Sequence, residues 1–174
     1  VFGATLAVAL HAAMPRSALR FIAESDNDPT ALREGRIDLD IGSIQEHGPE
    51  IKTEALFDQR LVGAVREDHH LVQSRVTLKR FASALHVAIG QRGTYRGPLD
   101  DALQSAGHRR FVLLTVPSAY GCLMAAARSE LVATVPARLA QNMHSSLGLR
   151  IFELPVELPP EQIVQAWHRR FDAD

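Results

Sequence analysis

Residues 32–44, with the sequence LREGRIDLDIGSI, constrain the fold of this chain more than any other stretch. Gly35 can close a short helix in the left-handed conformation, because glycine adopts it without a steric penalty. Apolar side chains then alternate along a predicted strand, at Ile37, Leu39 and Ile41. Gly42 and Ser43 follow at the carboxyl end of this strand, where open α/β sheets bind their ligands. The stretch therefore predicts a helix, a strand and the rim of a ligand crevice.

The rest of the chain alternates between the two hydrophobic periods that are typical of helices and strands. The helical period predicts helices over residues 2–14, 28–35, 77–84, 98–107, 118–127 and 136–143. Alternation and short apolar runs predict strands or extended segments over residues 19–23, 37–41, 51–57, 60–65, 87–90, 111–116, 131–135, 151–154 and 163–168. The run at 111–116 is of the buried type. Strands that alternate with helices predict an α/β fold with a largely parallel sheet.

Two crossings in the predicted element order divide the chain into two subdomains. The chain leaves the first subdomain near Phe57 and returns to it near Pro155. We therefore expect residues 1–58 and 156–174 to form subdomain I, and residues 59–155 to form subdomain II. No strand precedes the first helix, so we expect the natural protein to supply the first strand of subdomain I upstream. A cleft between two such halves is a natural ligand site.

Composition and charge exclude several function classes. With 19 Lys and Arg against 20 Asp and Glu, the formal charge is -1, so no general basic field would draw the chain to nucleic acid. Any DNA contact should come from a separate segment. The only cysteine, Cys122, excludes an intrachain disulfide, which favours a reducing cytoplasm. The apolar run of residues 2–14 is too short to span a bilayer, so we expect no membrane partner.

Four stretches resemble, in the same order, the effector-binding domain of LysR-type transcriptional regulators. LREGRIDLDIG resembles its first inter-domain stretch, EALFDQRLVGAVREDHHL its crossing strand, SAYGCLMAAARSELVATVP its serine-capped helix and following turn, and IVQAWHRRFDAD its returning strand. Two departures affect loops. The usual Asp-His-Pro-Leu is Asp-His-His-Leu at 68–71, and a usual glycine-rich turn is Arg-Ser-Glu at 128–130.

The resemblance implies a periplasmic-binding-protein type 2-like fold, with two Rossmann-like subdomains and a ligand cleft between them. It implies a cytoplasmic homodimer or homotetramer that binds a small-molecule effector without any cofactor. DNA would be bound only through a winged helix-turn-helix domain ahead of residue 1, which is absent from this chain. The same fold also serves solute-binding proteins for transport and a few α/β enzymes, so these remain alternative functions.

Ser118 is the leading candidate for effector binding. It stands at a predicted helix start, where a hydroxyl and backbone amides can hold a carboxylate or another anionic group. Serine is also a common helix N-cap, and the two roles can coexist when the helix points into a cleft. Ala119 would line the same mouth. These groups favour a small organic acid, which makes the expected effector anionic.

Two further stretches are candidates because they follow strand ends. Gly42, Ser43 and Ile44 follow the strand of residues 37–41, although a plain strand-ending turn explains them as well. The loop of residues 90–97, GQRGTYRG, offers Thr94 as a hydrogen-bond donor and Arg92 and Arg96 as anion partners. A solvated loop with two surface arginines is the alternative for this segment. Its sequence lacks the ending of a phosphate-binding P-loop.

Thr5 and Ser25 complete the predicted effector site. Thr5 lies in the first turn of the first helix, and Ser25 lies just past the strand of residues 19–23. Both positions should approach the mouth of the cleft, and the resemblance places effector contacts in these two regions. A helix cap and a turn are their alternative roles.

We expect neither a metal ion nor a catalytic group. None of the eight histidines forms a metal-binding motif or pairs with cysteine at zinc-site spacing. His69 and His70 should lie on a surface loop, and the basic cluster of residues 168–170 should be a solvated strand end. No nucleophile elbow or dinucleotide-binding fingerprint is present.

The first helix also predicts self-association. It carries a core stripe of Phe2, Leu6, Leu10 and Met14, yet Ala4, Val8 and Ala12 make its other side apolar too. A helix that is apolar all round is buried all round. We therefore expect a partner subunit to cover the second side, in a two-fold dimer whose other contact is the partner's helix of residues 136–143.

Overall fold

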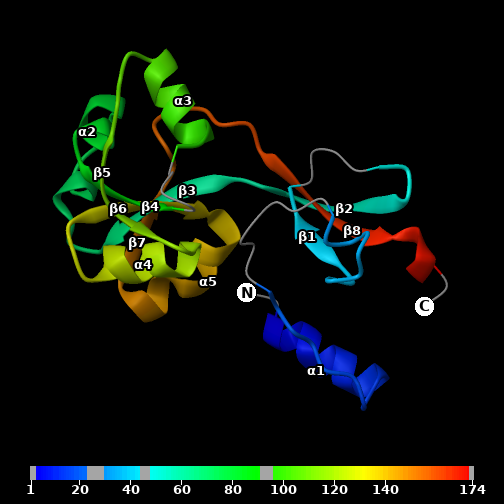
Figure 1. The fold of residues 1–174 in the computed structure, drawn as a ribbon. Coiled ribbons are helices and arrows are strands. Elements are labelled where there is room, and N and C mark those ends of the chain that lie inside the picture. Colours follow the sequence, from blue (N-terminus) through cyan, green and yellow to red (C-terminus); the bar gives the residue numbers. More distant parts are fainter. Residues whose placement is uncertain (1–2, 23–29, 44–47, 91–95, 173–174) are drawn as a thin grey trace.

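The computed structural model describes residues 3–22, 30–43, 48–90 and 96–172 of the chain. Its helices are α1 (Gly3–Ala13), α2 (Leu78–Ala82), α3 (Pro98–Ser105), α4 (Ala119–Ala127) and α5 (Ala137–Leu147). Its strands are β1 (Asp40–Gly42), β2 (Ile51–Gln59), β3 (Leu61–Arg66), β4 (Leu85–Ile89), β5 (Phe111–Val116), β6 (Leu131–Pro136), β7 (Leu149–Phe152) and β8 (Glu161–His168). Two 3-10 turns, η1 (His70–Val72) and η2 (Arg169–Phe171), follow β3 and β8 (Figure 1).

The strands form two sheets. Sheet A has the order β1-β8-β2, and sheet B has the order β5-β4-β6-β3-β7. In sheet A both neighbours of β8 are antiparallel to it. In sheet B, β4 runs parallel to β5 and β6, whereas β3 runs antiparallel to β6 and β7. The predicted α/β class is correct, but a largely parallel sheet is wrong. Alternation with helices does not reveal that β3 pairs antiparallel with β6 and β7, or that β8 pairs antiparallel with β1 and β2.

Sheet B carries most of the buried apolar residues. One cluster lies between the sheet and helices α4 and α5, and it includes Val62, Val87, Leu123, Val135 and Ala140. A second cluster lies on the side of α2 and α3, and it includes Val65, Phe81, Leu99, Leu103 and Val132. Figure 1 shows α4 and α5 along one side of sheet B and α2 and α3 along the other. Sheet B is therefore the sandwiched layer of a three-layer unit.

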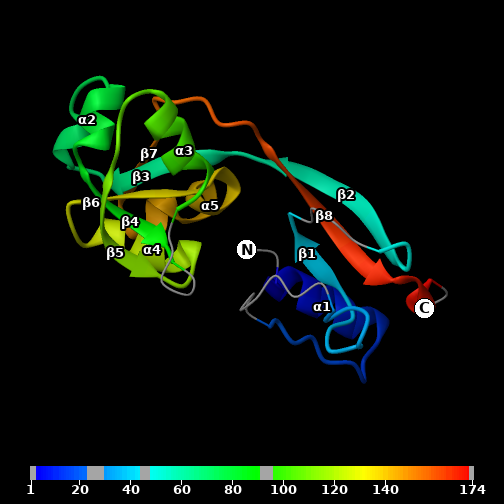
Figure 2. The same ribbon diagram turned by 45° about the horizontal axis from the view of Figure 1, so that its top comes forward.

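The chain crosses between the sheets twice. It passes from β2 of sheet A directly into β3 of sheet B, and it returns through residues 153–160 into β8. Figure 2 shows β2 and β8 side by side along this path. Sheet A is consequently built from segments on both sides of sheet B in the sequence. Its small core contains Leu32, Ile51 and Ala166, with Ile37 packed against them.

Helix ends follow the chemistry that the sequence predicts. Thr77 caps α2, because its Oγ1 accepts a hydrogen bond from the backbone N–H of Arg80 at 3.4 Å. Gly35 and Gly107 have φ angles of +70° and +75°, which glycine tolerates best. Gly148 closes α5 in the same left-handed conformation. These residues lie where the sequence predicts that structural elements begin or end.

Three predicted elements of subdomain I are wrong in detail. The predicted strand of residues 37–41 is observed only as β1, Asp40–Gly42. Residues 30–35 form hydrogen-bonded turns rather than a helix, with the N–H of Glu34 bonded to Thr30 O at 2.9 Å. The described residues 19–22 of the predicted 19–23 strand are not a strand. The ring of Phe21 instead lies beside Gly3, 3.0 Å from where a Cβ at that glycine would stand. Alternating side chains make a strand only where a sheet edge is available to pair with.

The basic cluster of residues 168–170 is not merely a solvated strand end. Arg170 donates from Nη2 to the carbonyl oxygen of Leu32 at 2.9 Å and also to that of Arg33. The N–H of Arg169 donates to Glu50 O at 2.9 Å. The end of β8 is therefore tied to the turns that precede β1, because the guanidinium of Arg170 donates to carbonyl oxygens at the end of those turns.

Helix α1 buries none of its residues, and Val8 on it is 73% exposed. Figure 1 shows this helix beside sheet A and remote from sheet B. Among the residues that the structure describes, no helix has both the length and the apolar character needed to cross a membrane.

Candidate functional site

The parallel strands of sheet B define the edge at which a ligand site is expected. Because β4, β5 and β6 run parallel, their carboxyl ends lie at one edge of the sheet, at Ile89, Val116 and Pro136. Helices α4 and α5 both begin at this edge. Open α/β sheets bind ligands in such a position, since the first amides of a helix have no partner within the helix.

Ser118 occupies this edge as the N-cap of α4. Its backbone is extended, and its Oγ accepts a hydrogen bond from the N–H of Gly121 at 3.2 Å. The predicted cap is confirmed. The hydroxyl is exposed and keeps its own proton for a further acceptor. Ala119, the first residue of α4, is half-buried beside it.

The other predicted effector residues are spread over the chain. Gly42 ends β1 in sheet A, paired with Val164, and Ser43 follows it with an exposed side chain. Thr5 is exposed on α1. Ile44, Ser25 and Thr94 lie outside the described residues. The structure thus brings Ser118 and Ala119 together, and it places Gly42 and Ser43 on the other sheet.

Arg96 does not offer a free guanidinium to an anion. Its Nε and Nη2 both lie close to Asp101 Oδ1, at 3.2 and 3.0 Å, and Nη2 also reaches Gln104 on α3. The predicted role of Arg96 as an anion partner therefore has to compete with contacts to its own helix.

Two hollows lined by described residues contain none of the predicted effector residues. One, of about 440 Å³, is lined by residues 14–17 after α1. The other, of about 200 Å³, lies at the β2–β3 crossing and is lined by residues 58–60, Ala137, Arg138 and Gln141. Its two arginines are engaged, since Arg138 lies 4.3 Å above the Phe57 ring and Arg60 pairs with Glu153 at 2.7 Å.

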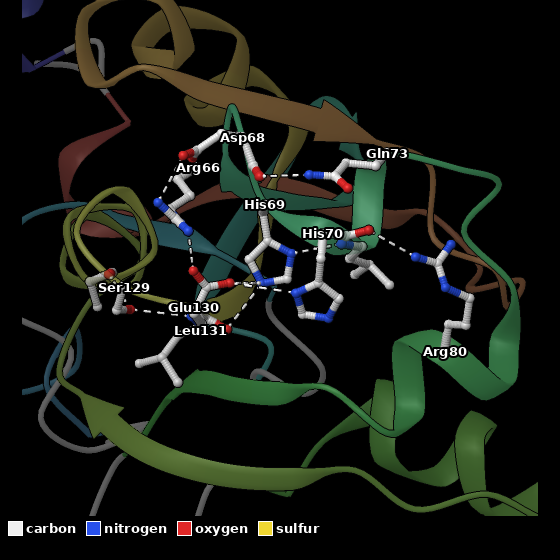
Figure 3. Close-up of polar contacts among 11 residues, drawn as sticks. Arg66, Asp68, His69, His70, Gln73, Arg80, Ser129, Glu130 and Leu131 are labelled. Carbon is white, nitrogen blue, oxygen red and sulfur yellow. Dashed lines mark hydrogen bonds and ion pairs between the residues drawn. The ribbon is translucent and has the colours of Figure 1, made fainter.

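His69 is fully buried, so its predicted surface position is wrong (Figure 3). Its Nδ1 accepts the N–H of Leu71 at 3.0 Å, and its Nε2 lies 3.1 Å from the carbonyl oxygen of Glu130. His70 is exposed and stacks on it, with ring centroids 4.4 Å apart. An adjacent pair of histidines on a loop carries no periodicity, so the sequence could not distinguish the buried ring from the exposed one.

The cluster of His69, His70 and Glu130 is the group of described residues whose ligand atoms lie close enough for a metal ion, within 4.8 Å of one another. The hydrogen bonds of His69 argue against that use. Because Nδ1 accepts a backbone N–H, the neutral ring carries its proton on Nε2 and donates it to Glu130. A metal ligand needs a lone pair on that nitrogen instead. The residues present therefore fit a hydrogen-bond network better than a metal site.

Arg66 completes this network. Its guanidinium pairs with Glu130 and, at 2.9 Å, with Asp68 (Figure 3). Desolvation raises the pKa of Glu130, but the hydrogen bond and charge of the neighbouring Arg66 lower it, and the net result is a pKa below the usual value. The network joins the end of β3 to the turn between α4 and β6, and so stabilises the far end of the helix that Ser118 begins.

His86 is a second buried histidine, on β4, the inner strand between β5 and β6. Its Nε2 lies 2.9 Å from the carbonyl oxygen of Phe81, and its Nδ1 has no protein partner. Burial lowers the pKa of His86 to about 4. The ring is therefore neutral at pH 7 and acts as a packing group. Its place between Leu85 and Val87 in an apolar run was the available sign of burial.

Comparisons with known proteins agree with this architecture. The family model described as the LysR substrate binding domain matches residues 4–173. The transcriptional activator NahR of Pseudomonas putida is 35% identical over 151 residues, which cover 83% of this chain and 48% of NahR. The activator NagR of a Ralstonia species is 31% identical over 143 residues, which cover 82% of this chain and 48% of NagR.

A solved structure gives the same result. The regulatory domain of MexT, a transcriptional activator in Pseudomonas aeruginosa, superposes with a TM-score of 0.82 at 25% identity, covering 99% of this chain and 84% of that one. The chain spans about half the length of the curated relatives it matches.

Proposed function

The chain belongs to the family of LysR substrate-binding domains, and on that basis we propose that it senses a small organic acid for a transcriptional regulator. Domains of this family are the effector-binding parts of regulators rather than enzymes. Because the chain spans only about half of its curated relatives, the activity and partners of the whole protein are part of the proposal. The observation that carries it is the capped start of α4 at the carboxyl edge of sheet B.

We propose that the effector binds between two subdomains, residues 1–58 with 156–174 and residues 59–155. Their separate sheets support this division, since β1, β2 and β8 form sheet A and the remaining strands form sheet B. Ser118 and Ala119 would contribute from sheet B. The other proposed contacts are Thr94 and, from the stretch of residues 1–58, Thr5, Ser25, Gly42, Ser43 and Ile44.

The proposed effector is anionic because of the chemistry at the start of α4. A helix N-terminus carries a partial positive charge, and the hydroxyl of Ser118 adds a donor beside it. Binding would favour one of two arrangements of the subdomains, and this requires different affinities for the two. A winged helix-turn-helix domain ahead of residue 1 would carry the change to DNA, in the cytoplasm.

A thermal-shift screen of small organic acids tests the proposed function. An acid at a hundredfold excess over its Kd should add about 2.7 kcal/mol of stability. For a chain of this size, that is a rise in Tm of roughly 5–10 °C. The screen should also recover the acid unchanged. A panel in which no acid raises the Tm, or a hit that is chemically consumed, contradicts the proposal.

Replacing Ser118 by alanine should weaken a confirmed effector by about 1–3 kcal/mol through the lost hydrogen bond. The free energy of unfolding should fall by only about 1 kcal/mol, the usual value of an N-cap. Titration calorimetry and urea unfolding measure the two effects. Thr77→Ala is the matched control, because Thr77 caps α2 away from this edge. It should lower stability similarly and leave effector affinity unchanged, whereas equal affinity in both variants would remove Ser118 from the site.

We also propose a homodimer, which could pair further into a tetramer, with α1 and α5 of each copy packed antiparallel on the other. The support is the exposure of an apolar helix, since α1 buries no residue and Val8 is 73% exposed. A surface of this kind is typical of a protein interface. The two contacts would be reciprocal and would close a two-fold assembly.

Val8→Glu should therefore produce a monomer, because a charge would be desolvated in the interface. Sedimentation at micromolar concentration measures the assembly, and circular dichroism checks that the chain stays folded. Val8→Thr, which keeps the shape without the charge, should remain dimeric. A parent chain that is already monomeric, or a dimeric Val8→Glu variant, would show that the interface is misassigned.

A further inference from the structure

Strand β5 lies at an edge of sheet B, and its own side chains specify its position poorly. It pairs only with β4, and neither of its faces is buried. Phe111 is 63% exposed and Leu113 is 57% exposed, and the part-buried residues are Val112 and Val116. Pairing register is set by the hydrophobic pattern only where one face of a strand is buried. The pattern of β5 gives no such preference.

A slip of two residues would cost this strand little in apolar contact. It would place Leu114 where Val112 or Val116 now stands, so one apolar side chain would replace another. The pairing with β4 already contains an irregularity, because His86 pairs with Val112 and Val87 pairs with Leu114, so that Leu113 is passed over. Something other than burial must therefore select the observed register.

A buried ion pair stands immediately before β5. Arg110 donates from Nε to Asp100 Oδ1 at 2.8 Å and from Nη2 to Oδ2 at 2.9 Å. The two side chains are only 6% and 15% exposed. A planar guanidinium that meets a carboxylate through two parallel hydrogen bonds has one geometry, so it fixes both partners.

Asp100 is itself held in place. Its Oδ2 also accepts the N–H of Gly97 at 3.1 Å, which closes the first turn of α3. Helix α3 is anchored in the core through Leu99 and Leu103. Arg110 is thus tied to a rigid element, and a slip of β5 by two residues would pull its guanidinium out of a buried site. That would leave a charge unpaired, which is far costlier than exchanging one apolar side chain for another.

We propose that the Asp100–Arg110 pair is a positioning device that sets the register of β5 against β4, and thereby the location of Ser118. Ser118 stands two residues beyond the end of β5, so a slip of two residues that passes through this short connection would move it by up to about 6.6 Å along the strand direction. The proposed role of this pair in setting the register is argued from the structure alone. Its consequence for effector binding rests on the proposed function.

Cysteine crosslinking reads the register directly. Ile89→Cys with Val116→Cys marks the observed register, because these residues are paired. Ile89→Cys with Leu114→Cys marks a slip in one direction, and Val87→Cys with Val116→Cys marks a slip in the other. Each pair is introduced into the parent chain and into an Asp100→Asn, Arg110→Met background. Asparagine keeps an acceptor for the N–H of Gly97, and the double change leaves no unpaired charge.

In the parent background, mild oxidation should crosslink only the Ile89 and Val116 positions. In the double variant, the crosslink yield of at least one slipped pair should rise severalfold while that of the observed pair falls. A matched control is the exposed ion pair between Arg96, just before α3, and Asp101 on α3, with side chains 62% and 66% exposed. Arg96→Met with Asp101→Asn should crosslink like the parent. A folded double variant that crosslinks only in the observed register overturns the proposal.

A second variant covers the case in which the double variant does not fold. Arg110→Lys keeps the charge but cannot form the two parallel bonds. It should show slipped crosslinks at a yield between those of the parent and the double variant, and a yield equal to the parent overturns the proposal. These measurements use no effector. A failed screen of organic acids would therefore contradict the proposed function and leave the crosslink result intact.

Discussion

Lowering the pH from 7 to 4 should destabilise this chain by about 3 kcal/mol through His86 alone. The ring is fully buried in strand β4 and donates a hydrogen bond to the carbonyl oxygen of Phe81. Its other nitrogen has no protein partner. Protonation would place an unpaired charge in an apolar core, and burial accordingly lowers the pKa from 6.5 to about 4.

The sign of the effect follows from which state binds the proton. Above pH 6.5, His86 is neutral in both the folded and the unfolded chain, so its contribution to stability is constant. Between pH 6.5 and about 4, the unfolded chain binds a proton that the folded chain does not bind. Stability therefore falls by about 1.4 kcal/mol for each pH unit in this window. Below the folded pKa, both states are protonated and this contribution stops changing.

Urea unfolding at closely spaced pH values from 7 to 4 measures the effect. The comparison protein is His86→Gln, whose amide can donate to Phe81 O but does not titrate in this range. Ionisable groups remote from His86 contribute equally to both proteins, so the difference between the two curves reports His86 together with its effect on the pKa of the neighbouring Asp100. Parallel curves for the parent and His86→Gln would show that His86 does not carry the acid sensitivity.

Replacing His69 by leucine should cost about 2–4 kcal/mol of unfolding free energy. The substitution removes the partner of two backbone groups, the buried N–H of Leu71 and the part-buried carbonyl oxygen of Glu130. Each buried group that loses its hydrogen bond costs about 1–3 kcal/mol. Leucine restores some apolar contact but neither hydrogen bond.

The neighbouring ring provides the control. His70→Leu removes a histidine from the same turn, but this side chain is 67% exposed and its loss should change stability by less than about 0.5 kcal/mol. Urea unfolding at pH 7.5 measures both variants. Equal effects of the two substitutions would mean that the stabilising contacts of His69 are misassigned.

Local chemistry made much of the fold predictable. Ser118 and Thr77 cap helices as expected, because a short hydroxyl side chain can reach the free amides of the first turn. Strands β5 and β6 lie where apolar β-branched and leucine-rich runs indicated them. Gly148 ends α5 in the left-handed conformation that favours glycine.

Properties that depend on distant partners were not predictable. Strand β5 was expected to be buried because it is apolar, yet it lies at a sheet edge, and edge position is a matter of strand order. Residues 19–22 alternate as a strand would but are not paired with either sheet. The burial of His69 depends on a carbonyl group 61 residues away. The local sequence contains no information on strand order, on strand pairing or on distant hydrogen-bond partners.

The candidate site was predictable to the same degree. Strand-end and helix-start patterns located Ser118, Gly42 and Ser43 at element ends, which the structure confirms. Whether these residues contact one ligand depends on how the two sheets face each other. A pattern within a segment carries no information on that relation, so the effector contacts remain a prediction.

The place of β8 in sheet A has a consequence for the chain during translation. This strand is central in sheet A, between β1 and β2, but among the described strands it comes last along the chain. All five strands of sheet B are complete by Phe152, so sheet B can close on a nascent chain. Until β8 emerges from the ribosome, β1 and β2 have no described neighbour, and the apolar face of Ile51 stays uncovered. Sheet A is therefore the late-folding half, and newly made chains should be most exposed to chaperones and to aggregation through β2.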